Sequence, residues 1–203
     1  VASSSSVGGD ITNEGEITDS VDGIVIVDTS TIEGDITNSG EIDAEYGIVV
    51  VDSSSVDGDI TNSGEISSDT GILILGSSSV GGDITNEGEI TASDSGIVVA
   101  SSSSVGGDIT NEGDINAAAS GILVTYSSTV IGDINNGAEA TIDAVAQGIN
   151  VDGSSHIVGD ITNSGDIFAD GYGIYFNSST VSGNITNSGE ITDSNWGIVV
   201  ASS

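Results

Sequence analysis

The chain of 203 residues contains no lysine, arginine, cysteine, proline or methionine, and aromatic residues make up only 3% of it. Because phosphate groups are bound through cations, a chain without lysine or arginine is unsuited to nucleic acid or to anionic membrane surfaces. The absence of cysteine excludes disulfides and thiolate metal sites. No apolar run reaches the 18 residues that a membrane-spanning helix needs, so we expect no direct membrane insertion.

Acidic residues, in contrast to basic ones, are numerous: 32 aspartates and glutamates give the chain a formal net charge of -32. Strong acidity with few aromatic residues is typical of disordered chains. Here 36% of the residues are hydrophobic, and they recur in a strict register. A folded chain with a thin, repetitive core is therefore the better interpretation, because few large side chains exist to fill a thick one.

The string GDITN and its close variants recur eight times along the sequence. The column that it defines separates successive copies by 25, 24, 24, 25, 25, 27 and 24 residues and ends in asparagine in the eighth copy. Its first seven members are Asp10, Asp35, Asp59, Asp83, Asp108, Asp133 and Asp160. A fixed period of this length indicates stacked structural repeats.

Five apolar columns, mostly β-branched, run through the copies and begin at Val7, Ile11, Ile17, Ile24 and Ile26. Within each copy they alternate locally with Thr, Ser and Gly, which favours short strands and excludes helical repeats. The sequence therefore predicts an all-β fold, a right-handed parallel β-solenoid (β-helix) of eight coils with 24 to 27 residues and three short strands each. We expect residues 1–203 to form a single solenoid domain, roughly 40 Å long at about 4.8 Å per coil.

The sixth copy departs from the pattern. Ala140 stands where the third column requires isoleucine, and Ile142 follows two residues later. This shift accounts for the 27-residue spacing and predicts a two-residue bulge or loop within that coil.

One asparagine occurs at the same place in every copy, where we expect the first corner of each coil. Asparagine tolerates left-handed geometry, and stacked amides bond to the coils above and below. The expected ladder consists of Asn13, Asn38, Asn62, Asn86, Asn111, Asn136, Asn163 and Asn187. The Gly23 and Ser5 columns predict two further corners.

A core phrase, I-x-N-x-G-x-I followed by G-I-x-V, appears as ITNEGEI with GIVIV, ITNSGEI with GIVVV, and ITNSGDI with GIYFN, and related sequence runs through all eight copies. They resemble the repeats of bacterial autotransporter and haemagglutinin-like passenger domains. The resemblance implies an exported bacterial protein with a right-handed β-helix, located at the cell surface or outside the cell, where such domains act as adhesins or stalks.

Parallel stacking places the seven aspartates of the GDITN column in one outward row, beside a column of threonines that begins at Thr12. Neighbouring carboxylates at about 4.8 Å repel by roughly 1 kcal/mol even in water. Two interpretations remain open: Ca²⁺ ions bridge these aspartates, or the row is solvated and screened by salt. A second acidic column begins at Glu16. No recognised calcium motif is present, so we expect no required cofactor, with Ca²⁺ as the candidate ion.

Another column lies between the inward residues of the last strand of each coil and is mostly apolar. Strict alternation would expose it as a stripe for lateral contact with another rod, whereas a twist or bulge would bury it. Its apolar members are Val25, Val49, Leu73, Val98, Leu123, Tyr175 and Val199.

We expect no enzymatic activity, because the carboxylates belong to the repeat itself and catalytic sites normally break a repeat. The predicted function is that of a structural, surface-displayed or secreted repeat protein, as an adhesin stalk or extracellular filament subunit. The alternative is a Ca²⁺-binding or ice-binding solenoid. Residues 1–15 recur unchanged at 99–113, so we expect a longer repeat array or a unit that self-associates head-to-tail or laterally. Tyr46, Tyr172 and Trp196 precede the corner glycine and suit stacking on host or cell-surface glycans.

Overall fold

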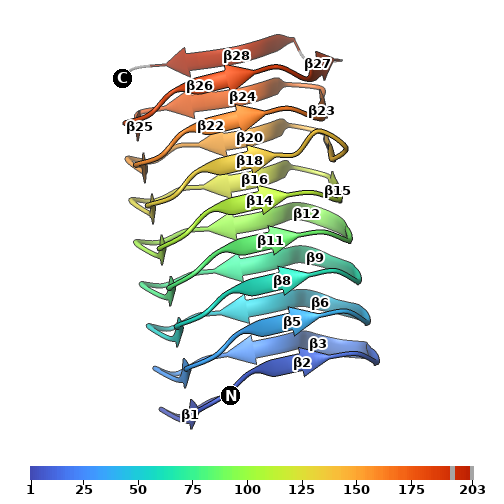
Figure 1. Cartoon of the computed structure of the whole chain (residues 1–203), viewed down its shortest axis with the longest axis vertical. Helices are drawn as coiled ribbons and strands as arrows, with labels where there is room; N and C mark the ends of the chain where they lie inside the picture. The colour runs from blue at the N-terminus through green and yellow to red at the C-terminus, as the bar shows by residue number, and fades with distance from the viewer. Residues whose placement is uncertain (193–194, 202–203) are drawn as a thin grey trace.

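The computed structural model describes residues 1–192 and 195–201, and it shows a β-solenoid built from stacked coils. In Figure 1 the near strands run to the right and the far strands to the left while the chain climbs from its N-terminus, which is a right-handed winding. All strand pairs in the ladders are parallel, as in β4 with β7 and β11 with β14. The predicted fold class is therefore confirmed.

The first sheet has eight strands of two residues each. They are β1 (Ser6–Val7), β4 (Thr31–Ile32), β7 (Ser55–Val56), β10 (Ser79–Val80), β13 (Ser104–Val105), β17 (Thr129–Val130), β21 (His156–Ile157) and β25 (Thr180–Val181).

The second sheet has eight strands of three residues, which carry the Ile-Thr-Asn phrase or its variant. They are β2 (Ile11–Asn13), β5 (Ile36–Asn38), β8 (Ile60–Asn62), β11 (Ile84–Asn86), β14 (Ile109–Asn111), β18 (Ile134–Asn136), β22 (Ile161–Asn163) and β26 (Ile185–Asn187).

The third sheet has twelve strands and differs between the two halves of the rod. In coils one to four each coil contributes one long strand: β3 (Glu16–Ile26), β6 (Glu41–Val50), β9 (Glu65–Ile74) and β12 (Glu89–Val99). In coils five to eight each coil contributes two: β15 (Asp114–Ala117) and β16 (Ser120–Val124), β19 (Thr141–Ala144) and β20 (Gln147–Val151), β23 (Asp166–Ala169) and β24 (Tyr172–Asn177), and β27 (Glu190–Thr192) and β28 (Trp196–Ala201). The expectation of three short strands per coil was thus incomplete, because the third is long or divided.

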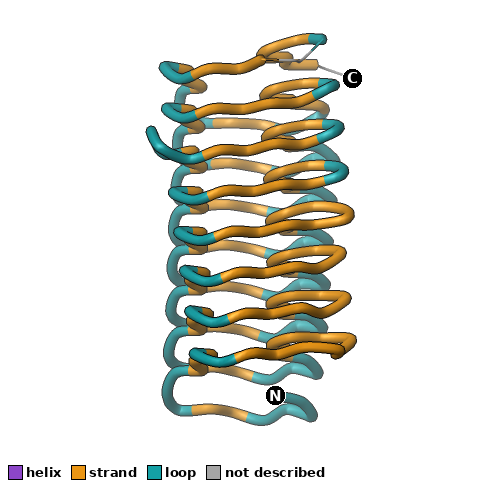
Figure 2. Tube along the Cα trace, turned by 90° about the vertical axis from the view of Figure 1, so that its right-hand side faces the viewer, coloured by secondary structure: helices purple, strands orange, loops and turns teal. Residues whose placement is uncertain are grey.

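The register places like residues on like throughout the stack. Ile84 of β11 pairs with Ile60 on one side and Ile109 on the other, and all three are fully buried. Isoleucine and valine fill the space between the three sheets, and Figure 2 shows the resulting narrow, even tube of coils. The β-branched columns predicted from the sequence are this core.

Coil six accommodates its two extra residues in a turn. The N–H of Ala140 donates to the carbonyl of Gly137 (3.1 Å), and Ile142 then pairs with Ile115 of the coil below. Ala140 is itself buried. The insertion is absorbed before the strand resumes, as the sequence predicted.

The third sheet bends at a column of glycines, of which Gly47 is an example. A Cβ atom at Gly47 would lie 2.6 Å from Cγ2 of Ile66 and would overlap the carbonyl oxygen of Gly71. Only glycine lets successive coils approach this closely at the bend.

A left-handed turn precedes the first sheet in each coil. In coil two it is formed by Asp28 and Thr29, with φ of 59° and 58°, and it leads into the buried Ser30. The hydroxyl of Ser30 accepts the N–H of Ser5 (3.2 Å), while the N–H of Ser30 donates to the hydroxyl of Ser54 (3.1 Å). A serine ladder therefore closes the third corner, at the cost of left-handed backbone in residues other than glycine.

Among the described residues no helix is long and apolar enough to cross a membrane.

Candidate functional site

Equivalent side chains of successive coils form rows along the axis of the rod, so each candidate site is such a row. Besides the serine ladder, two polar rows flank the strands of the second sheet: a largely buried row of asparagine amides and an outward row of aspartate carboxylates. Both rows sit at the ends of the second sheet, where the chain enters and leaves each Ile-Thr-Asn strand.

The asparagine row is a continuous ladder. Nδ2 of each asparagine donates to Oδ1 of the asparagine in the next coil, at 2.7 to 2.9 Å, from Asn13 to Asn187. In mid-rod, Asn86 is fully buried, and its Nδ2 also reaches the carbonyls of Gly88 (3.1 Å) and Asp114 (3.2 Å). The amides thus satisfy backbone groups that the corner would otherwise leave without partners.

The aspartate row has a structural role that the sequence did not reveal. Oδ1 of Asp83 accepts the backbone N–H of Asp108 at 2.8 Å, and the same bond recurs in every coil step from Asp10 to Asn184. A carboxylate replaces a backbone carbonyl as the acceptor where the chain turns into the second sheet. The preceding glycine is required here as well, because a Cβ at Gly58 would overlap Oδ1 of Asp35.

This geometry bears on the calcium hypothesis. One oxygen of each aspartate in the row accepts a hydrogen bond from a backbone N–H. The partial positive charge of that N–H weakens the repulsion between the carboxylates of neighbouring coils. Within residues 1–192 and 195–201 no group of three acidic or histidine side chains is gathered as metal ligands. Each N–H bond leaves fewer lone pairs of the row free for a cation, and bridging by Ca²⁺ stays one of the two open predictions.

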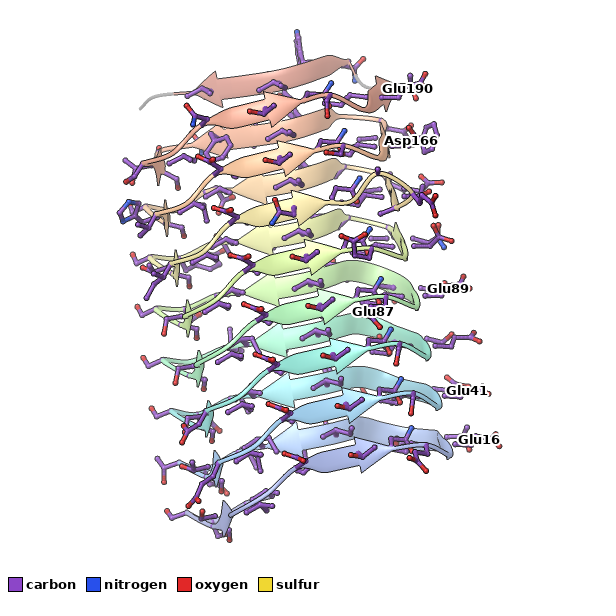
Figure 3. The ribbon with its side chains drawn as sticks, in the orientation of Figure 1. Glu16, Glu41, Glu87, Glu89, Asp166 and Glu190 are labelled. Atoms are coloured by element: carbon purple, nitrogen blue, oxygen red, sulfur yellow. The ribbon has the colours of Figure 1, made fainter. Side chains whose placement is uncertain are left out.

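The second acidic column stands apart from these bonds. Figure 3 shows Glu16, Glu41, Glu89 and Glu190 projecting from the same edge of the rod into solvent. All four side chains are exposed, and in coil six Thr141 takes the place of the acid. The column is therefore a solvated, negatively charged edge that runs along the rod.

The predicted lateral stripe is less exposed than strict alternation implies. Val49 and Val98 are only 4% and 8% exposed, and Val25, Leu73, Leu123, Tyr175 and Val199 are half-buried. The strand bends at the corner glycine, and in-register neighbours cover one another's side chains. The structure thus agrees with the burial alternative in part, and lateral contact through this stripe stays a prediction.

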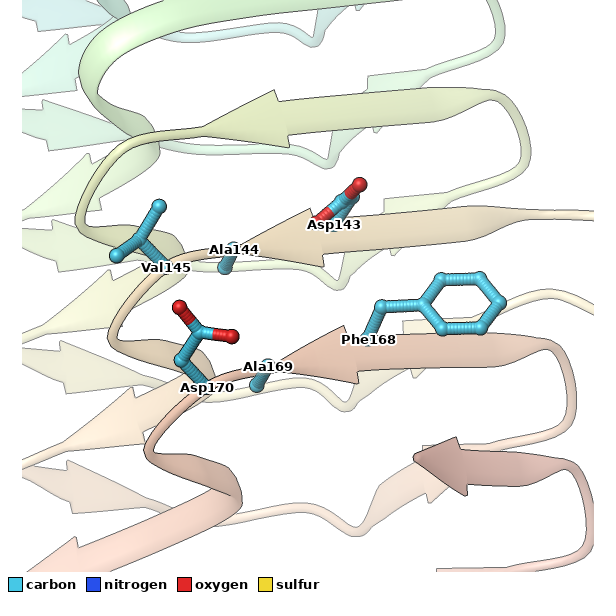
Figure 4. A pocket seen from close by; sticks show the side chains of 6 residues that line it. All are labelled: Asp143, Ala144, Val145, Phe168, Ala169 and Asp170. Carbon is cyan, nitrogen blue, oxygen red and sulfur yellow. The ribbon is translucent and has the colours of Figure 1, made fainter. Parts of the chain in front are cut away.

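A shallow depression of about 350 Å³ lies on coils six and seven. Figure 4 shows its lining, with Asp143 and Phe168 from one face of the strands and Asp170 near the turn. Two similar depressions follow along the rod, and each shares residues with the next, such as Thr91 and Asp143. Alanines line the floor of this furrow, which is open to solvent rather than enclosed.

Sequence reasoning missed the aspartate and serine backbone bonds, because composition does not reveal which partner a side chain meets. It also did not single out Phe168 as part of a surface depression. The sequence held a signal, because the equivalent residues are polar in the neighbouring coils: Asp143 below and Thr192 above. Comparison with protein-family models, with curated proteins and with solved structures gives no match for this chain.

Proposed function

We propose that the chain is a structural rod, displayed on the bacterial cell surface or secreted, that serves as an adhesin stalk or an extracellular filament subunit. The observation that supports this proposal best is the unbroken stacking of all eight coils through continuous ladders of backbone, asparagine, aspartate and serine bonds. Such a stack transmits load along its axis, because force is shared by parallel hydrogen bonds in three sheets.

The surface chemistry is consistent with an extracellular role. A net charge of -32 without a single lysine or arginine keeps neighbouring rods apart and soluble, and it disfavours anionic partners. The resemblance of the repeats to passenger domains supports export to the surface. Self-association, head-to-tail or lateral, is part of the proposal, because residues 1–15 recur unchanged at 99–113 and coils of the same register stack on one another.

The test is surface labelling. Antibodies raised against the folded rod are applied to intact cells of the source organism and to permeabilised cells, and the culture medium is assayed in parallel. We expect labelling of intact cells or recovery from the medium, with signal lost after brief protease treatment of whole cells. Labelling only after permeabilisation, with an empty medium, would overturn the proposal.

Rod mechanics give a second measurement. Pulling single molecules from both ends should show unfolding at high force in steps that correspond to whole coils or groups of coils. Smooth extension at low force would contradict a stalk function.

A further inference from the structure

The aromatic residues are unevenly placed along the rod. The chain has seven, and five of them fall between residues 168 and 196. They are Phe168, Tyr172, Tyr175, Phe176 and Trp196. Phe176 is 2% exposed and belongs to the core, whereas the other four are half-buried or exposed. Since the rest of the sequence repeats so closely, a local break of this kind is where a specific function is expected.

Three of these rings form one stack. The ring centroids of Tyr172 and Tyr175 are 4.5 Å apart, with an interplanar angle of 23°. The ring centroids of Tyr172 and Trp196 are 5.1 Å apart, with an interplanar angle of 16°. Tyr172 and Tyr175 are half-buried in coil seven, below the strands of coil eight. Stacking fixes the orientation of rings that would otherwise rotate, so an aromatic surface is held ready for a ligand.

A buried amide accompanies the rings. Asn150 pairs across the strands with Tyr175 on one side and with Leu123 on the other. It is only 7% exposed, and no donor among the described residues reaches its Oδ1. The five preceding coils place valine or leucine in this column, so an aliphatic side chain fits here and would avoid the orphaned acceptor.

An unpartnered buried carbonyl costs on the order of 1–3 kcal/mol, so a donor that reaches it when the side chains covering it move is bound favourably. Gln147, in the same coil, pairs with Tyr172 and accepts the hydroxyl of Ser120 through Oε1 (2.9 Å), which leaves its amide hydrogens as further donors. Coils six to eight therefore combine flat rings with amide donors and acceptors on one face.

We propose that Tyr172, Tyr175 and Trp196, with Asn150 and Gln147, form a binding site for a neutral saccharide. The C–H face of a pyranose stacks on an aromatic ring, and its hydroxyls both donate to and accept from amides. The chain carries no cation, so acidic sugars gain no ion pair and are repelled by the surrounding charge. This activity goes beyond the proposed rod and does not depend on its cellular location.

Trp196 is the only tryptophan, so emission excited selectively at tryptophan, and not at tyrosine, reports on this site alone. The folded protein is titrated with a panel of neutral pyranosides and disaccharides (methyl glucoside, methyl galactoside, lactose, maltose and cellobiose), with glucuronate and sorbitol as controls. We expect at least one neutral sugar to give a saturable change in emission at millimolar concentration, with no response to glucuronate or sorbitol.

Variants separate binding from folding. Tyr172→Ala should weaken binding at least tenfold, and Asn150→Leu should weaken it similarly while raising the melting temperature, because it restores the aliphatic column. Tyr46→Ala is the matched control: it removes a tyrosine from the same column, in coil two, away from the stack. It should leave binding unchanged.

The proposal is overturned if no neutral sugar gives a saturable response, if glucuronate binds as well as the neutral sugars, or if Asn150→Leu and Tyr172→Ala bind like the parent protein. Each of these outcomes leaves the surface-labelling result of the rod untouched, so the two proposals fail separately.

Discussion

Removing one rung of the asparagine ladder in mid-rod should be among the most destabilising single changes in the protein. In Asn86→Ala the two amide hydrogens no longer serve Asn111 Oδ1 and the two nearby carbonyls, and Nδ2 of Asn62 loses its acceptor. Three net hydrogen bonds at about 1 kcal/mol each, plus a penalty of about 1 kcal/mol or more for buried groups left unpaired, give a loss of about 4 kcal/mol.

The assay is urea unfolding followed by far-ultraviolet circular dichroism, analysed by linear extrapolation. The matched control is Asn116→Ala, which deletes the same atoms from an exposed asparagine. Among the described residues its side chain makes one hydrogen bond, from Nδ2 to a carboxylate oxygen of Glu89 at 3.4 Å. Its effect should stay within about 0.5 kcal/mol. Asn86→Asp should be at least as damaging as Asn86→Ala, because it faces a buried carboxylate with acceptor oxygens.

The reasoning would be refuted if Asn86→Ala cost less than about 1 kcal/mol or no more than Asn116→Ala. Either result would mean that water or a backbone shift replaces the lost amide, and that the ladder fixes register without contributing to stability.

Three further predictions concern the turns and the aspartate row. Thr29→Gly should stabilise the fold by about 0.5–1 kcal/mol in the same assay, because a β-branched residue is strained at φ 58° and glycine is not. The larger conformational entropy of glycine in the unfolded chain keeps the gain small. A decrease in the free energy of unfolding would contradict this prediction. Asp83→Asn should stabilise by about 1 kcal/mol at low salt and less at high salt, because it keeps the acceptor for the N–H of Asp108 and removes a like charge, whereas Asp83→Ala should cost about 1–3 kcal/mol. Ca²⁺ and Mg²⁺ should raise the melting temperature equally at matched ionic strength, and a rise specific to Ca²⁺ would show that the carboxylates bind that ion.

The sequence predicted the parts of this fold that depend on periodicity. The column of Ile84, the ladder through Asn86 and the two-residue insertion before Ile142 all follow from the spacing of the repeat, because parallel in-register stacking turns a period directly into a neighbour. The strand lengths could not be predicted from the repeat. The sequence predicts a corner at Gly47, but β6 continues through the bend there and stays paired with β9 on both sides of it.

Side-chain partners were harder to predict than positions. That Asp83 faces outward follows from alternation. Its bond to the N–H of Asp108 depends on Gly107, because a Cβ atom there would overlap Oδ1 of Asp83. The exposure of Val49 also depends on the bend and on stacked neighbours, neither of which alternation includes. The aromatic stack was visible in sequence only as scattered residues, because Tyr175 and Tyr172 meet around a corner.

The stacking register has a consequence for how such a rod changes over generations. Since each coil bonds to its two neighbours through the same set of contacts, deleting residues 59–82 would join Gly58 to Asp83 and leave every remaining rung with an equivalent partner. Each deletion or duplication of one repeat in the gene therefore changes the length of the rod by one coil, or about 4.8 Å. Recombination between identical segments, such as 1–15 and 99–113, would change the number of coils, so the length of the rod is inherited as a repeat copy number.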